Sequence, residues 1–196
     1  MPALKRIGIF GGSFNPVHRG HLTLAALARR QLALDTIFYV PAKCPPHKLG
    51  QVLAPPEDRV NMLKLCIGAA GRVSLFEVSR AQTTYTWQTL RYFRLRFPSA
   101  QLFFILGGDS ISEIGAWKHS ELIAKLCTIA AGARIGAKFI VPKILAASVV
   151  KLRGKIPDIS STRIRNLLAE RKPVAGKVGN RVAEYIAKHK LYENTK

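Results

Sequence analysis

The chain has 196 residues, with 31 Lys and Arg against 11 Asp and Glu, and a formal net charge of +20. This length predicts one domain, residues 1–196, with room for a sizeable core. Apolar residues make up 48% of the chain and charged residues 21%, which is ordinary globular usage and excludes disordered and fibrous classes. No apolar run approaches the roughly 18 residues that span a bilayer, which excludes a membrane-embedded protein.

The cysteines and the N-terminal residues indicate the cellular compartment in which we expect the protein. Three widely spaced cysteines without a CxxC pair indicate reduced thiols. The N-terminal residues do not have the pattern of a signal peptide. We therefore expect a cytoplasmic protein.

The charge of +20 favours polyanionic partners, namely nucleic acid, phosphorylated substrates or anionic lipid. The excess covers the whole chain, because residues 1–34, 78–108 and 122–157 contain no acid. It is therefore not a detachable basic tail. A nucleic-acid-binding module is a remote alternative, since no known recognition motif accompanies the charge and aromatic residues make up only 8%.

Strand-like and helix-like segments alternate along the chain. Apolar and β-branched runs predict strands at 4–10, 36–40, 73–78, 102–106, 127–131 and 148–152. Helical spacing predicts helices near 20–34, 57–67, 85–97, 110–125, 161–170 and 178–188. The alternation predicts an α/β fold, a single Rossmann-like doubly wound parallel sheet with helices on both faces. Ligands bind beyond the carboxyl ends of such strands, so we expect function in loops 11–21, 41–48, 79–86, 107–118 and 153–163.

The first of these loops contains two glycines and two histidines. Gly11 and Gly12 let a ligand approach the backbone closely, because glycine has no Cβ. His18 and His21 are three residues apart at a helix start, where both imidazoles can face one point and the helix end favours phosphate. A tight strand–helix connection with two incidental histidines is the plainer alternative. A zinc site is disfavoured because no Cys or acid lies nearby, and the spacing fits neither the dinucleotide fingerprint nor the P-loop.

Two motifs carry a resemblance to a known superfamily. Residues 11–21, Gly-Gly-Ser-Phe-Asn-Pro-Val-His-Arg-Gly-His, resemble the nucleotidyltransferase motif Gly-x-Phe-x-Pro-x-His-x-Gly-His. Residues 159–165, Ile-Ser-Ser-Thr-Arg-Ile-Arg, resemble the second signature of that superfamily, in the form typical of pyridine-nucleotide adenylyltransferases. Without the resemblance, this second stretch is a capped helix start with Arg165 one turn on, which would also suit a phosphate clamp.

Further segments are similar to bacterial nicotinate mononucleotide adenylyltransferases. Residues 41–48 are similar to the Pro-x-x-x-Pro-Pro-His-Lys motif of that family, and residues 84–91 and 102–118 to two later segments. The resemblance covers essentially the whole chain, so it implies a single nucleotidyltransferase domain over residues 1–196. Two departures are Asn15 and Gln88, which stand where Asp is common, and Gln88 is expected to weaken a helix-end contact.

The implied reaction transfers the adenylyl group of ATP to nicotinate mononucleotide, giving deamido-NAD and pyrophosphate, in NAD biosynthesis. The resemblance also implies direct attack by the acceptor phosphate, with Mg²⁺ carried by ATP and no metal bound by protein side chains. Nicotinamide mononucleotide, or use of both acceptors, is the alternative. Phosphopantetheine adenylyltransferases lack the Pro-Pro-His-Lys loop, and class I aminoacyl-tRNA synthetases are far larger than this chain.

The resemblance implies a role for each matched residue. His18, His21 and Arg165 are expected to be catalytic, with His21 stabilising the transition state. The expected ATP-binding residues are Gly11, Gly12, Ser13, Phe14, His18, His21, Gly107, Asp109, Ser161, Thr162 and Arg165. The expected mononucleotide-binding residues are Lys48, Tyr85, Thr86, Trp117 and Lys118. Among them, Asp109 would accept hydrogen bonds from ribose hydroxyls, Lys48 would hold the acceptor phosphate and Trp117 would stack on the pyridine ring.

Overall fold

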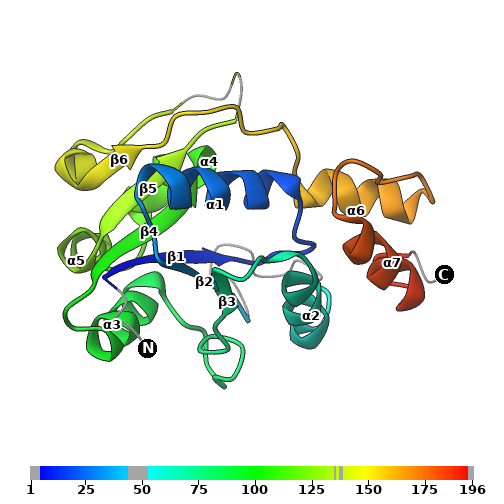
Figure 1. The fold of residues 1–196 in the computed structure, drawn as a ribbon, viewed down its shortest axis with the longest axis horizontal. Coiled ribbons are helices and arrows are strands. Elements are labelled where there is room, and N and C mark those ends of the chain that lie inside the picture. Colours follow the sequence, from blue (N-terminus) through cyan, green and yellow to red (C-terminus); the bar gives the residue numbers. More distant parts are fainter. Residues whose placement is uncertain (1–4, 44–52, 135, 137–138, 194–196) are drawn as a thin grey trace.

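The computed structural model describes residues 5–43, 53–134, 136 and 139–193. Six parallel strands form one sheet in the order β3-β2-β1-β4-β5-β6 (Figure 1). The strands are β1 (Arg6–Gly12), β2 (Thr36–Pro41), β3 (Gly71–Val73), β4 (Gln101–Gly107), β5 (Thr128–Gly132) and β6 (Val149–Lys151). The predicted doubly wound parallel sheet is confirmed.

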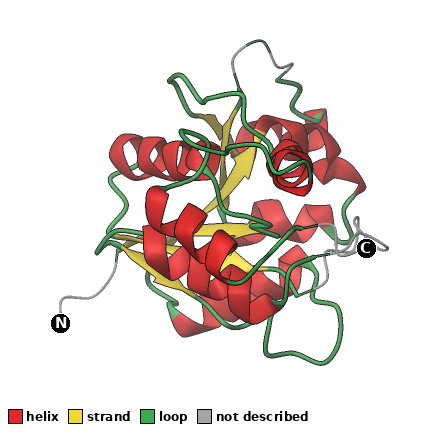
Figure 2. Ribbon diagram, turned by 90° about the vertical axis from the view of Figure 1, so that its right-hand side faces the viewer, coloured by secondary structure: helices red, strands yellow, loops and turns green. Residues whose placement is uncertain are grey.

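Helices flank the sheet on both sides (Figure 2). The α-helices are α1 (Arg19–Gln31), α2 (Pro56–Cys66), α3 (Thr86–Arg96), α4 (Gly108–Glu113), α5 (Ser120–Leu126), α6 (Ser161–Ala169) and α7 (Asn180–Lys188). Two short 3₁₀ helices, η2 (Ile114–Ala116) and η3 (Lys143–Ser148), accompany them. No helix among the described residues is long and apolar enough to cross a membrane.

Two predicted elements were wrong in extent. The third strand ends at Val73, and residues 74–79 form a turn in which the Ser79 amide donates to the Leu75 carbonyl at 3.0 Å. The predicted helix over 110–125 is three pieces, because Trp117 is extended and His119 has a left-handed φ of 55°. Trp117 therefore lies between two helical pieces rather than inside one continuous helix.

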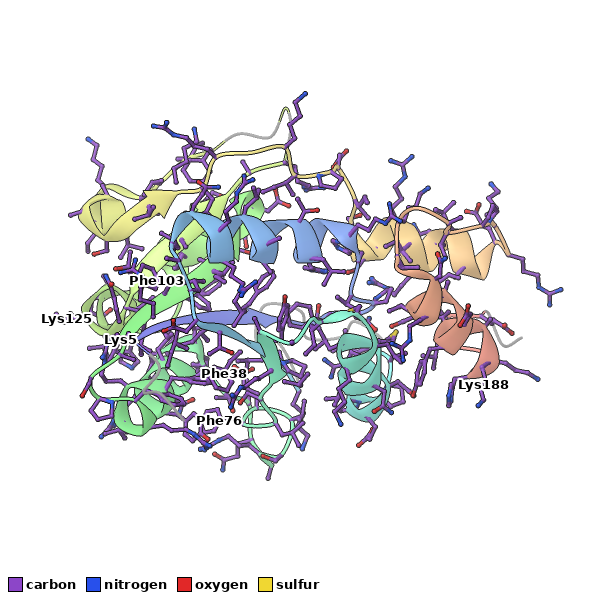
Figure 3. The ribbon with its side chains drawn as sticks, viewed as in Figure 1. Lys5, Phe38, Phe76, Phe103, Lys125 and Lys188 are labelled. Atoms are coloured by element: carbon purple, nitrogen blue, oxygen red, sulfur yellow. The ribbon has the colours of Figure 1, made fainter. Side chains whose placement is uncertain are left out.

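Side chains of the central strands alternate between two hydrophobic layers. On β4, Phe104 and Leu106 belong to the layer covered by α3 and α5, while Phe103 and Ile105 belong to the layer that also contains apolar residues of α1, α2, α6 and α7. All four are at most 4% exposed. Figure 3 shows Phe103 between the sheet and α1, with Phe38 on the other face. Burial on both faces explains the continuous apolar run that predicted this strand.

The chain changes direction at the middle of the sheet. From β1 it runs to β2 and β3 on one side, and then returns to β4, β5 and β6 on the other. A crevice forms beyond the carboxyl ends of strands at such a point. Basic residues are not confined there, since Lys125 and Lys188 lie at opposite ends of the molecule (Figure 3).

Candidate active site

A cavity of about 820 Å³ opens beyond the carboxyl ends of β1, β4 and β5. The predicted site residues that line it are Gly11, Gly12, Ser13, His18, His21, Tyr85, Thr86, Gly107, Asp109, Trp117, Lys118, Ser161, Thr162 and Arg165. Four loops that are distant in the sequence therefore meet at one cavity. Lys48, expected at the acceptor phosphate, lies outside the described residues.

The two histidines cap the start of α1 reciprocally. The His21 amide donates to Nδ1 of His18 at 3.4 Å, and the His18 amide donates to Nδ1 of His21 at 3.2 Å. The rings stack with centroids 3.7 Å apart. Because each Nδ1 accepts a hydrogen bond, the proton of each neutral ring is on Nε2, which makes Nε2–H a donor. The local fold thus prepares two donors at the wall of the cavity.

The environment of His18 keeps its ring neutral. Burial, with a smaller contribution from the charge of Arg134, lowers the His18 pKa to about 4. Gly20 makes room for this ring, since a Cβ on Gly20 would lie 3.0 Å from it. A neutral imidazole there can donate a hydrogen bond to a phosphate oxygen without carrying a charge of its own.

The start of α6 is fastened to the first loop. The hydroxyl of Ser161 donates to the Pro16 carbonyl at 2.9 Å, and Nη1 of Arg165 donates to the Asn15 carbonyl at 2.9 Å. The Ser161 hydroxyl is therefore engaged by the protein, and this residue would reach a ligand through its backbone amide. First-turn amides have no partner inside a helix, so the start of α6 favours an anion in the cavity.

Asn15 joins the first loop to the C-terminal part of the fold. Its Oδ1 accepts hydrogen bonds from the Tyr192 hydroxyl and from the Ala54 amide, both at 2.9 Å. The side chain is fully buried. Both bonds use the oxygen, which an Asp in this place would also supply, so this departure from the family pattern leaves the two contacts intact.

Arg59 was not predicted, yet it orders two loops at the cavity. This side chain is fully buried in α2. Its Nη1 donates to the carbonyls of Ser13 at 2.8 Å and Ala42 at 2.6 Å, and its Nε donates to that of Ala54 at 3.0 Å. A guanidinium has enough donors in a rigid fork to bind several carbonyls at once, so Arg59 holds the loops after β1 and β2 together.

Asp109 lies at the start of α4 and is bound by a residue that sequence reasoning missed. Nη2 of Arg134 contacts Asp109 Oδ2 at 2.5 Å, and Nη1 contacts Asp158 Oδ1 at 2.6 Å. Arg134 also lines the cavity. Its position just after β5 was the available signal, because ligands bind at the carboxyl ends of strands. The second oxygen of Asp109 can still accept from a hydroxyl group.

The acceptor side of the cavity is formed at the start of α3 and around Trp117. Trp117 is half-buried with its ring edge-on to Phe104 at 6.4 Å. Nζ of Lys118 lies 4.6 Å from the centre of the Tyr85 ring. Oε1 of Gln88 accepts from the Tyr85 amide at 2.9 Å, so the helix-end contact that Gln88 was expected to weaken is present. An aromatic ring, Trp117, and a cation, Lys118, therefore lie near the start of α3.

Phe14, predicted to bind ATP, has its side chain behind the cavity wall rather than on it. Its side chain is 1% exposed and does not line the cavity. The ring instead packs edge-on against Phe10 at 5.4 Å and His21 at 5.1 Å. A phenyl ring gains more from this apolar contact than from water, so Phe14 supports His21 from behind.

The sheet order and the cavity at its switch point define an α/β protein of the doubly wound, nucleotide-binding class. Residues 9–167 match the family described as Cytidylyltransferase-like. The chain is 41% identical over 189 residues to a Thermus thermophilus protein, covering 95% of this chain and 99% of that one. It is 35% identical over 191 residues to a Lactiplantibacillus plantarum protein, covering 96% and 89%. Both relatives are named "Probable nicotinate-nucleotide adenylyltransferase".

A solved structure shares the fold. It is the Plasmodium falciparum nicotinic acid mononucleotide adenylyltransferase complexed with NaAD, with a TM-score of 0.78 at 20% identity over 96% of this chain and 97% of that chain. The sequence relatives exceed 30% identity over nearly their whole length. The chain belongs to the nicotinate-nucleotide adenylyltransferase family.

Proposed function

We propose that this chain is an enzyme of NAD biosynthesis that transfers the adenylyl group of ATP to nicotinate mononucleotide. An oxygen of the mononucleotide phosphate forms a bond to the α-phosphorus of ATP. The bond from that phosphorus to the oxygen bridging to the β-phosphate breaks, and pyrophosphate leaves with the electron pair. The products are deamido-NAD and pyrophosphate.

The observation that carries the proposal is the pairing of His18 with His21 opposite the start of α6. Both imidazoles line the cavity and both hold Nδ1 in helix-capping bonds. Nε2–H donors and the α6 amides with Arg165 then surround the place where charge develops as pyrophosphate departs. Donors fixed before the reaction stabilise such charge without reorganisation, and positioning supplies the rest.

We propose that Mg²⁺ enters the cavity bound to ATP. The groups expected to bind the triphosphate are the imidazoles of His18 and His21, the guanidinium of Arg165 and the backbone amides of α6, which bind phosphate oxygens rather than a cation. Mg²⁺ prefers oxygen ligands and commonly takes them from substrate phosphates and water. When bound with ATP, Mg²⁺ would neutralise part of the negative charge of the triphosphate.

A comparison of the two mononucleotides as acceptors tests the proposal. The protein is incubated with ATP and Mg²⁺ plus nicotinate mononucleotide, nicotinamide mononucleotide or no acceptor, and pyrophosphate release is measured. We expect release with nicotinate mononucleotide, and its absence with both acceptors would contradict the enzymatic function. Equal rates with both acceptors would instead establish dual specificity. Salt-sensitive binding to random DNA without any release would favour the nucleic-acid-binding alternative.

Replacement of Trp117 tests the place of the pyridine ring. Trp117→Ala is expected to raise the KM for the mononucleotide about tenfold, because stacking and ring burial contribute on the order of 1–2 kcal/mol. The KM for ATP should stay within about twofold. Trp117→Phe keeps an aromatic face and should recover most of the affinity. An effect confined to ATP would place the pyridine ring elsewhere.

A further inference from the structure

One carboxyl group on the cavity wall has no part in the reaction described above. Glu77 lies in the turn over residues 74–79, where a strand was predicted, and it lines the cavity together with Tyr85 and Thr86. Its Oε1 accepts a hydrogen bond from the hydroxyl of Thr89 at 2.6 Å. Thr89 is 3% exposed on the first turns of α3, so this bond fixes the carboxyl group against the start of that helix.

A second polar group on the same cavity wall, the hydroxyl of Thr84, is available for a hydrogen bond with a ligand. Thr84 is 8% exposed and lines the cavity, and its Oγ1 is buried without a hydrogen bond among the described residues. A buried hydroxyl without a partner costs free energy, and a polar ligand group would remove that cost. Glu77, Thr84 and Thr89 therefore make a polar end to a cavity whose neighbouring surface is aromatic.

The surroundings of Glu77 disfavour its charged form. Burial raises the Glu77 pKa to about 7, and the hydrogen bond from Thr89 opposes this only in part. The group is thus neutral below about pH 7 and ionised above it. This range coincides with ordinary assay conditions, so both forms are accessible to the working protein.

Charged groups from several elements surround this wall. Lys43 donates from Nζ to the Arg80 carbonyl at 2.8 Å, and the Arg80 guanidinium lies 5.0 Å from the centre of the Phe76 ring on the same turn as Glu77. Lys118 approaches from beyond η2. The other charged or titratable groups on the cavity wall are His18, His21, Asp109, Glu113, Arg134 and Arg165. Lysine and arginine keep their charge through the neutral range, and His18 with its pKa of about 4 stays neutral there.

We propose that Glu77 determines acceptor specificity, taking the carboxylate-bearing mononucleotide in its neutral form and disfavouring that acceptor in its ionised form. The inference rests on the proposed function, which places the pyridine ring on Trp117 beside the start of α3. The two candidate acceptors share the pyridinium charge and the phosphate, and they differ by one carboxylate. Two carboxylates in one site cannot both ionise cheaply, so nicotinate binding draws a proton onto Glu77. An amide in that place has no such requirement.

The test is the ratio of kcat/KM for nicotinate mononucleotide to kcat/KM for nicotinamide mononucleotide, followed from about pH 6 to about pH 8.5. Titration of the shared phosphate and of groups around ATP cancels in this ratio. In the unmodified protein we expect the ratio to fall as pH rises past 7, approaching about tenfold per pH unit as linkage to one proton requires. In Glu77→Gln the ratio should stay constant and equal the low-pH value, because Gln mimics the neutral acid and can still accept from Thr89.

Glu113→Gln is the matched control, since Glu113 is another carboxyl group on the cavity wall. This variant should keep the slope of the ratio against pH. A pH-independent ratio in the unmodified protein, or a slope retained in Glu77→Gln, would overturn the inference. Loss of the slope in Glu113→Gln would show that the slope reflects the general charge of the cavity. This result would also overturn the inference. Transfer to neither acceptor at any pH would instead contradict the proposed function itself.

Discussion

The His21→Ala variant is expected to lose about a thousandfold in kcat/KM, because one preorganised donor at a developing charge commonly contributes a hundredfold to a thousandfold. His21 lines the cavity, and because its Nδ1 accepts a hydrogen bond from the His18 amide, the proton of the neutral ring is on Nε2. Its ring is also backed by Phe14. Pyrophosphate release at saturating nicotinate mononucleotide measures the loss, which should appear mainly in kcat.

Two further variants separate chemistry from helix capping. His21→Asn keeps a side-chain oxygen that can accept from the His18 amide, so it should recover the stability lost in His21→Ala, about 1 kcal/mol, without recovering turnover. His189→Ala removes an exposed histidine at the end of α7 and should leave turnover unchanged. Restored turnover in His21→Asn would show that His21 acts only as a cap.

The Arg165→Ala variant is expected to lower kcat/KM for ATP about a hundredfold and to weaken inhibition by pyrophosphate. Arg165 lines the cavity from the first turns of α6, and its Nη1 binds the Asn15 carbonyl. Its removal takes away a cation at the leaving group and one of the contacts that fix the first loop. Charge-assisted contacts of this kind each contribute about 1.5–3 kcal/mol.

Arg163→Ala provides the matched control on the same helix. Arg163 is exposed and does not line the cavity, so its replacement should leave both kinetic constants within about twofold. Arg165→Lys keeps the charge but not the guanidinium fork, and it should recover only part of the activity. Equal losses in Arg163→Ala and Arg165→Ala would show a general effect of surface charge rather than a phosphate contact.

The sheet and the general place of the site could be predicted from the sequence. Strands buried on both faces read as continuous apolar runs, and their alternation with helices defines a parallel sheet. The rule that ligands bind at the carboxyl ends of strands then selected loops 11–21, 107–118 and 153–163, which do meet at one cavity. Each of these signals lies within a short segment of the sequence, so it could be found without knowing which distant segments are in contact.

The missed residues depend on contacts between distant segments. Glu77 was assigned to a strand because the run over 73–78 is apolar and β-branched, and nothing local shows that the edge strand stops at Val73. Arg59 shares a helical face with Met62 and Leu63, and a charge at such a position was an available sign of burial. Its carbonyl partners in two loops could not be known without the fold. The side chain of Phe14 lies behind His21 rather than on the cavity wall, which could not be predicted because a motif match does not say which way a side chain points.

The fastening of the first loop also sets an order of events during folding. The contacts of Asn15 and Pro16 reach Ser161, Arg165 and Tyr192, which lie 145 to 177 residues further along the chain. Contacts so far apart in the chain form late. The six-stranded sheet can therefore form before the first loop is fastened, and this loop reaches its final place only when α6 and the segment around Tyr192 have docked onto it.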